Sequence, residues 1–256
     1  MIDLHCHLLC GLDDGASDLS VSLAMARMLV AGGVETVACT PHILPGLYHN
    51  DARTIRAGAE RLRAELVQRD IKLEVVCGSD AHMTPDFVAK LKSGEILTLA
   101  ESRYVLVEPP HHVAPIRLEQ FFFEILIAGY VPVLTHPERL TWIDSRYATI
   151  KRLARSGVWI QITAGSLVGD FGRSARYWAE RMLDDGLVHI LASDAHDVTR
   201  RPPNLAMGWE AARKRVGDDE ARHLVLTRPR GVLKNESPSS LPSPFHSPAL
   251  KPPKRA

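Results

Sequence analysis

Short apolar segments rich in β-branched residues alternate along the chain with longer amphipathic segments. The short segments predict strands, at positions 2–7, 34–39, 73–77, 104–107, 131–135, 158–163 and 188–192. In the longer segments the hydrophobic residues recur every three or four positions and predict helices, at positions 20–31, 51–69, 116–128, 146–155 and 174–185. Strands that alternate with helices are typical of parallel βαβ units, so we expect an α/β fold.

The number of predicted strands distinguishes between two α/β architectures. Seven strands within about 230 residues fit a small closed or nearly closed β/α barrel, somewhat shorter than the eight-stranded form. A doubly wound open sheet is the alternative, but no G-x-G-x-x-G motif follows the first strand. The barrel is therefore the preferred prediction.

The C-terminal segment differs in composition from the rest of the chain. Residues 236–256 contain six prolines and five serines and few aliphatic residues. Such a segment buries too little apolar surface to offset the entropy lost on ordering it. We predict one folded domain over residues 1–235 and a disordered Pro/Ser-rich tail over residues 236–256.

Composition excludes several classes of protein. The chain has 31 basic and 30 acidic residues, a formal net charge of +1, which argues against a general nucleic-acid binder. Its four scattered cysteines do not form the framework of a disulfide-rich domain. No apolar run reaches the roughly 20 residues of a membrane span, and the first residues do not resemble a signal segment. We expect a cytoplasmic protein without a membrane span.

Imidazoles and carboxylates follow six of the seven predicted strands. Only the sixth strand, which ends near Thr163, is followed by no ionisable group. The C-terminal ends of the strands in a parallel barrel meet at one face, where active sites lie. Side chains two positions apart on a strand also point the same way. We predict that nine residues gather there as metal ligands: His5, His7, Asp14, His42, Asp80, Glu108, His136, Asp194 and His196.

This set of ligands suits transition metals. Neutral imidazole combined with carboxylate is typical of zinc, iron and manganese sites. Nine ligands are too many for one ion and fit two or three ions with bridging carboxylates. A single His-x-His or Asp-x-His motif is weak, but its recurrence at one end of the barrel favours a metal cluster.

The motifs that carry these residues resemble the PHP (polymerase and histidinol phosphatase) superfamily. Within it, the chain is similar to the bacterial PHP-type protein-tyrosine phosphatases of capsule and exopolysaccharide operons. The matching stretches are positions 1–7, 11–16, 40–42, 108, 135–139, 192–196 and 201–203, and the resemblance extends to about residue 234. It implies a distorted (β/α)₇ TIM-like barrel of the PHP type with three divalent metal ions, often manganese, with iron or zinc as alternatives.

The chain departs from that group at one position. The third strand leads into Gly78-Ser79-Asp80, where the group usually has Gly-x-Glu. Aspartate is one methylene shorter, which changes the geometry at one metal. His82 could compensate, although we interpret it as a surface residue.

The resemblance implies hydrolysis of a phosphomonoester. Divalent ions lower the pKa of a bound water towards about 7 and bind the phosphoryl oxygens. Arg139 and Arg201 are predicted to clamp the phosphate because guanidinium groups match its oxygens bidentately. Asp194 or His196 is a candidate to protonate the leaving oxygen, provided that it is not fully committed to a metal. Tyr48 is predicted either to border the cleft or to have a packing role.

A cysteine-dependent mechanism is excluded by the sequence. Cysteine phosphatases need Cys-x₅-Arg, and none of the four cysteines has arginine at the sixth following position; these positions hold Leu12, Ala16, Pro45 and Met83.

The implied substrate is a phosphotyrosine protein, a membrane-associated bacterial tyrosine autokinase that controls capsule or exopolysaccharide synthesis. Two alternatives stay open. One is a small-molecule phosphatase, such as a histidinol-phosphate phosphatase, and the other is a non-catalytic regulator that binds the kinase. The sequence leaves the oligomeric state open.

Overall fold

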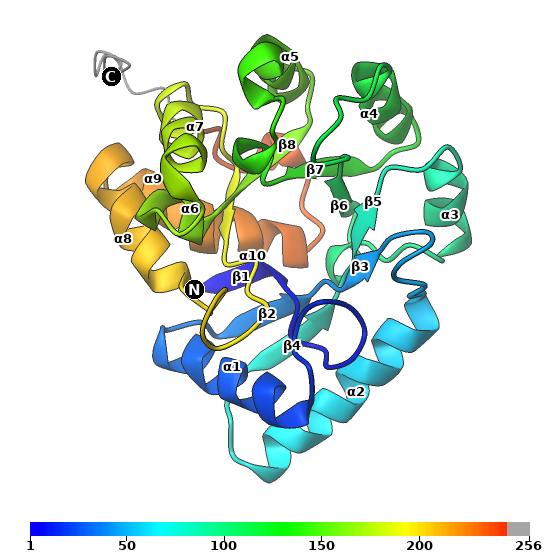
Figure 1. Ribbon diagram of the computed structural model, residues 1–256, viewed down its shortest axis with the longest axis vertical. Coiled ribbons are helices and arrows are strands. Elements are labelled where there is room, and N and C mark those ends of the chain that lie inside the picture. Colours follow the sequence, from blue (N-terminus) through cyan, green and yellow to red (C-terminus); the bar gives the residue numbers. More distant parts are fainter. Residues whose placement is uncertain (245–256) are drawn as a thin grey trace.

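Parallel strands form a barrel with helices around its outside (Figure 1). The computed structural model describes residues 1–244. One sheet has the order β1-β2-β4, and the other has the order β3-β5-β6-β7-β8-β9. The strands are β1 (Ile2–Cys6), β2 (Thr36–Cys39), β3 (His42–Ile43), β4 (Glu74–Cys77), β5 (Asp80–His82), β6 (Tyr104–Glu108), β7 (Val131–Thr135), β8 (Trp159–Thr163) and β9 (Ile190–Ala192).

The two sheets join into one barrel with seven strand positions, because two of these positions are each formed by two successive strands. After a short break, β3 continues the course of β2, and β5 continues that of β4. Pro41 stands in the first break and has no N–H to donate to a ladder. Gly78 stands in the second, where a Cβ would lie 2.9 Å from a methyl group of Leu99. The barrel closes where Cys6 bridges Ala195 beyond the end of β9.

The helices lie between successive strands and after the last one. They are α1 (Leu19–Ala31), α2 (Ala52–Gln68), α3 (Phe87–Ser93), α4 (Leu118–Ile127), α5 (Ile143–Arg155), α6 (Ala164–Val168), α7 (Gly172–Asp184), α8 (Leu205–Val216), α9 (Asp218–Arg222) and α10 (Arg228–Leu233). The predicted helices correspond to α1, α2, α4, α5 and α7. The distorted (β/α)₇ barrel predicted from the sequence is therefore confirmed.

Alternate strand residues pack into two separate cores. On β6, Leu106 belongs to a cluster made mainly of residues from other strands, whereas Val105 and Val107 pack with helix residues. The first cluster fills the barrel interior, and the second joins the barrel to its helices. This is the two-sided burial that parallel strands require.

An irregularity in β1 brings a histidine to the barrel axis. Leu4 belongs to the inner core and Cys6 to the outer one, although strict alternation would place both on one face. The register with β2 shifts between Asp3 and Cys6, which accounts for the change of face. His5 and His7 can therefore both point into the C-terminal end of the barrel.

Residues 236–244, the first part of the predicted tail, pack against the barrel. Leu241 is 9% exposed and belongs to the inner core. The Tyr104 hydroxyl donates to the carbonyl of Glu236 (2.9 Å), and Nε of Arg228 donates to the carbonyl of Pro242 (2.7 Å). These contacts contribute stabilisation against the entropy lost on ordering the segment, which its composition alone does not reveal. The rest of the predicted tail lies outside the described residues.

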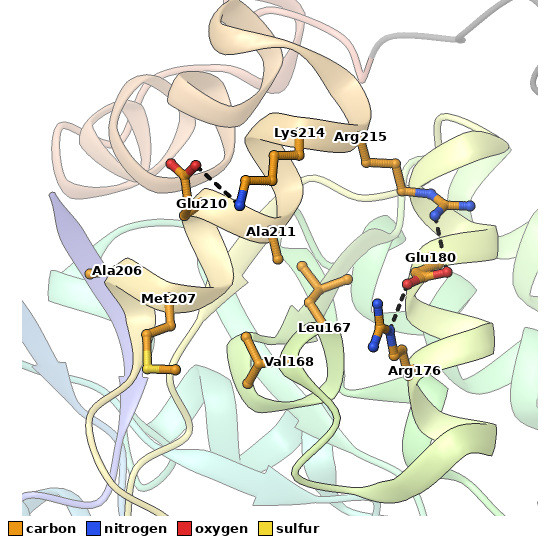
Figure 2. Close-up of a pocket in the computed structure, with 10 residues that line it drawn as sticks. All are labelled: Leu167, Val168, Arg176, Glu180, Ala206, Met207, Glu210, Ala211, Lys214 and Arg215. Carbon is orange, nitrogen blue, oxygen red and sulfur yellow. Dashed lines mark hydrogen bonds and ion pairs between the residues drawn. The ribbon is translucent and has the colours of Figure 1, made fainter.

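A cavity of about 800 Å³ lies between α6, α7 and α8 (Figure 2). Its lining includes none of the predicted site residues. Its charged side chains pair with one another, Arg176 and Arg215 with Glu180 and Lys214 with Glu210. Within residues 1–244, no helix is both long and apolar enough to cross a membrane.

The partly buried His189 is expected to make the fold sensitive to acid. Burial lowers the pKa of His189 to about 3, and the nearby Arg228 contributes to the lowering. Its Nδ1 accepts a hydrogen bond from the backbone N–H of Ile160, which requires the neutral ring. Between about pH 6.5 and pH 3 only the unfolded chain takes up this proton, so the free energy of unfolding decreases as the pH falls.

We expect His189→Asn to flatten this pH dependence. Asparagine does not titrate and can still accept from Ile160. The loss of unfolding free energy between pH 7 and pH 5 should be about 2 kcal/mol smaller than in the wild type. Urea denaturation at both pH values measures it, under the same metal conditions for both proteins. Equal losses in the two proteins would contradict the prediction.

Candidate metal centre

The nine predicted ligand residues converge at the C-terminal end of the barrel. Three groups each have ligand atoms within 4.8 Å of one another: His7, Asp14, His42 and His196; His5, His7 and Asp80; and His42, Asp80 and Glu108. His7, His42 and Asp80 each belong to two groups. The three groups therefore form one contiguous cluster rather than separate sites.

His136 and Asp194 lie against these groups. Nε2 of His136 is 3.7 Å from Oε1 of Glu108. Oδ1 of Asp194 lies 3.3 Å from Nε2 of His7 and 3.4 Å from Nε2 of His5. All nine residues are thus brought together, and their assignment as ligands stays a prediction.

The polar atoms in the cluster fit a site for cations. Both carboxylate oxygens of Asp80 are buried without a hydrogen-bond partner among the described residues. The same holds for Nδ1 of His42 and Nε2 of His196. Buried polar atoms are normally paired because an unpaired one costs free energy. Divalent ions would satisfy these lone pairs, so the donor set and its chemistry agree.

Two of the nine residues have an unusual backbone conformation. His136 has φ 32° and Asp194 has φ 51°, although neither is glycine. Side chains with a Cβ rarely adopt this left-handed region, and such residues concentrate at functional sites. In both cases the strained residue directly or closely follows a strand, β7 or β9. This agrees with a functional role at the strand ends.

A second layer of residues orients the histidines, and the sequence analysis missed it. Oδ2 of Asp13 lies 2.6 Å from Nδ1 of His7. Oε1 of Gln161, on β8, lies 2.9 Å from Nδ1 of His5. Such partners fix the ring so that its other nitrogen can bind a metal. Asp13 precedes Asp14 directly, so an acidic pair in the loop was the only signal in the sequence.

The charges around His7 and Asp13 shift the pKa values of both groups strongly. Burial lowers the pKa of His7, but the carboxylates of Asp13 and Asp194 outweigh it and raise the pKa to about 10. Burial raises the pKa of Asp13, but the imidazole of His7 and the backbone N–H groups of His42 and Gly15 outweigh it and lower the pKa to about 2. A metal must displace the proton of His7, so metal binding should weaken as the pH falls.

We expect Asp13→Asn to weaken metal binding by roughly 10- to 100-fold. Asparagine keeps the shape of the side chain but removes the charge that holds His7. A competition titration with a chelator measures the affinity. Asp18→Asn is the matched control, because Asp18 caps α1 and asparagine caps helices equally well. An unchanged affinity in the Asp13 variant would contradict this role.

The two predicted phosphate-binding arginines meet at one carboxylate. Nη1 of Arg139 and Nη2 of Arg201 both pair with Oδ2 of Asp194, the latter at 2.7 Å. Burial raises the pKa of Asp194, but Arg201, His5 and Arg139 outweigh it and hold the pKa well below its usual range. The carboxylate is therefore ionised and links the arginines to the cluster.

Glu138 anchors the segment that carries Arg139. Its side chain is 1% exposed, and Oε1 accepts from the backbone N–H of Thr163 and from the hydroxyl of Ser166, both at 2.8 Å. The Pro137–Arg139 turn is thereby fixed to the end of β8.

Two further side chains border the cluster. Nε2 of His82 lies 2.7 Å from Oε2 of Glu108, and the imidazole side chain is 19% exposed. The interpretation of His82 as a surface residue is therefore wrong, because β5 places it directly opposite Glu108 on β6. The ring of Tyr48 stacks on His42 with centroids 5.8 Å apart, at the expected edge of the site.

Two of the four cysteines are poorly suited to act as nucleophiles. Cys6 and Cys39 are buried, and burial raises the pKa of both thiols. A raised pKa disfavours the reactive thiolate. This agrees with the absence of a Cys-x₅-Arg motif from the sequence.

The barrel and its His/Asp/Glu cluster define the class as a TIM-barrel-like protein with a candidate metal centre. Solved structures of distant hydrolases share the fold alone, such as dihydropyrimidinase from Brevibacillus agri (TM-score 0.55, 11% identity, 91% of this chain and 70% of that chain). A family model described as "Capsular polysaccharide synthesis, CpsB/CapC" matches residues 1–234. The chain belongs to this CpsB/CapC family, and the predicted family and enzyme class are confirmed.

Relatives in this family are similar over nearly their whole length. The chain is 37% identical over 237 residues to the tyrosine-protein phosphatase YwqE of Bacillus subtilis, covering 93% of each chain. It is 28% identical over 245 residues to the tyrosine-protein phosphatase CpsB of Streptococcus pneumoniae, covering 92% of this chain and 99% of the relative. A crystal structure from a study of YwqE and CpsB, described as metal-dependent tyrosine phosphatases, superposes with a TM-score of 0.89 at 34% identity, over 93% of this chain and 96% of that chain.

Proposed function

We propose that this chain is a metal-dependent tyrosine-protein phosphatase of capsular polysaccharide synthesis. Its substrate would be phosphotyrosine on a membrane-associated tyrosine autokinase, which it would meet in the cytoplasm. The observation that carries the proposal is the contiguous ligand cluster with two arginines at its edge. The relatives that bear this activity cover the chain almost completely.

We propose three divalent ions, manganese in the first place and iron or zinc as alternatives. The residues of the three ligand groups, together with Asp194 and His136, would hold these ions. The ions supply Lewis acidity and a nucleophile at neutral pH. Four carboxylates against three divalent ions leave a local excess of about two positive charges, which attracts a phosphate.

The protein's own residues would bind and orient the substrate. Arg139 and Arg201 lie where a phosphoryl group beside Asp194 would be bound by their forked N–H groups. Asp194 is ionised, so it is better suited to hold these charges than to protonate the leaving oxygen. A phenolate leaving group, with a pKa near 10, needs little help from an acid. Tyr48, beside His42, would border the aromatic ring of the substrate.

A comparison of two substrates tests the proposal. The purified protein with Mn²⁺ should release phosphate from a phosphotyrosine peptide, and a chelator should abolish the release. Much faster hydrolysis of histidinol phosphate would instead support the small-molecule phosphatase. No hydrolysis of either substrate with the metals fully loaded would support the non-catalytic regulator.

A further inference from the structure

One aromatic ring contacts both arginines of the site. The guanidinium carbon of Arg139 lies 4.3 Å from the centroid of the Phe171 ring, and that of Arg201 lies 5.9 Å from it. Both distances are within the roughly 6 Å of a cation–π contact. The two guanidinium groups therefore share a ring as well as the carboxylate of Asp194.

The loop that carries Phe171 is held in place by its surroundings. A Cβ on Gly165 would lie 2.9 Å from Cε2 of Phe171, so only glycine leaves room for the ring. The side-chain amide of Asn204 donates to Asp170 (2.8 Å), the residue before Phe171. This bond joins the loop after α6 to the segment after β9 that also carries Arg201.

The arginines need such support because few hydrogen bonds fix them. Nε of Arg201 is buried and has no hydrogen-bond partner among residues 1–244. The two guanidinium groups are like charges that meet at one oxygen, and the proposed metal ions would repel both. The negative face of an aromatic ring offsets such repulsion without competing for the N–H donors that a phosphate needs.

We propose that Phe171 is a positioning residue that holds Arg139 and Arg201 in the orientation that binds a phosphoryl group. The proposal rests on the proposed function, because it names the support of the same phosphate site. The ring is partly exposed rather than part of either buried core. Its place beside the guanidinium groups is therefore not a by-product of core packing.

The test compares a substitution that removes the aromatic ring with one that keeps it. Phe171→Leu keeps an apolar side chain but removes the π face, whereas Phe171→Tyr keeps the ring. The probe is inorganic phosphate, titrated calorimetrically into the Mn²⁺-loaded protein. Metal content and melting temperature are measured on the same samples, so that loss of the fold or of the metals is recognised separately.

We expect Phe171→Leu to weaken phosphate binding roughly tenfold and Phe171→Tyr to change it less than about twofold, both with wild-type metal content. Wild-type affinity in the Leu variant, or equal weakening in both variants, would overturn the proposal. Weakening that only follows lost metal or a lost fold would also overturn it. If the wild type binds phosphate in this ring-dependent way but cleaves no phosphotyrosine peptide, the proposed function fails and the positioning role stands.

Discussion

Replacing Asp194 with Asn is expected to lower kcat/KM for a phosphotyrosine peptide by about a thousandfold. The substitution removes the charge that lies between two histidines of the cluster and two arginines. Loss of one charge aimed at the reacting group typically costs two to three orders of magnitude. Asparagine also tolerates the positive φ of this position, so the backbone should keep its conformation.

The measurement combines steady-state kinetics with metal analysis by mass spectrometry. Asp184→Asn is the matched control, because it removes a carboxylate that pairs with Arg215 at 2.6 Å on the helical outside of the barrel. The control should keep wild-type turnover. Near wild-type turnover in the Asp194 variant would exclude a central role for this carboxylate.

The second large effect concerns stability rather than catalysis. Glu220→Gln is expected to lower the free energy of unfolding by about 3 kcal/mol, because it leaves a buried guanidinium without its counter-charge. Both oxygens of Glu220 accept from Nη2 of Arg228, at 2.8 and 2.9 Å, and Arg228 is fully buried. For a chain of this size the melting temperature should fall by roughly 6 to 12 °C.

Thermal denaturation followed by circular dichroism checks this expectation. Glu119→Gln is the control, since the pair of Glu119 with Arg152 lies on the surface, where both side chains are more than half exposed. The melting temperature of the control should stay nearly unchanged, as is usual for surface pairs. Equal effects of the two substitutions would show that burial does not strengthen the Glu220–Arg228 pair.

The sequence predicted the first layer of the site because position along a strand decides it. In a parallel barrel every strand end reaches the same face, so a residue such as Glu108 or His136 can be placed without knowing its neighbours. The residues that were missed contact the site from other elements of the fold, which the sequence alone does not bring together. Gln161 is not ionisable and belongs to no motif in the sequence, and Phe171 meets Arg139 and Arg201 only in the folded structure.

The order of the strands and helices was also predicted from the sequence, whereas details that depend on contacts between distant residues were missed. Hydrophobic periodicity located all seven strand positions of the barrel. It did not locate the breaks that create β3 and β5, because these depend on Pro41 and on the close packing at Gly78. Composition suggested disorder from residue 236 onwards. In the structure Leu241 packs into the barrel interior, and the carbonyl of Pro242 accepts a hydrogen bond from Arg228.

The closure of the barrel also determines when the proposed metal centre can form during synthesis. His7 donates its backbone N–H to the carbonyl of Ala195, and Asp194 donates its own to that of His5, so the seam joins residues almost 190 positions apart. The proposed ligands of both edges meet across this seam. A ribosome-bound chain that has not yet exposed residues 194–196 therefore lacks a complete centre. Metal acquisition would be a late event that locks the first strand to the last, and hydrogen exchange along this seam should be the first to rise when metal is withdrawn.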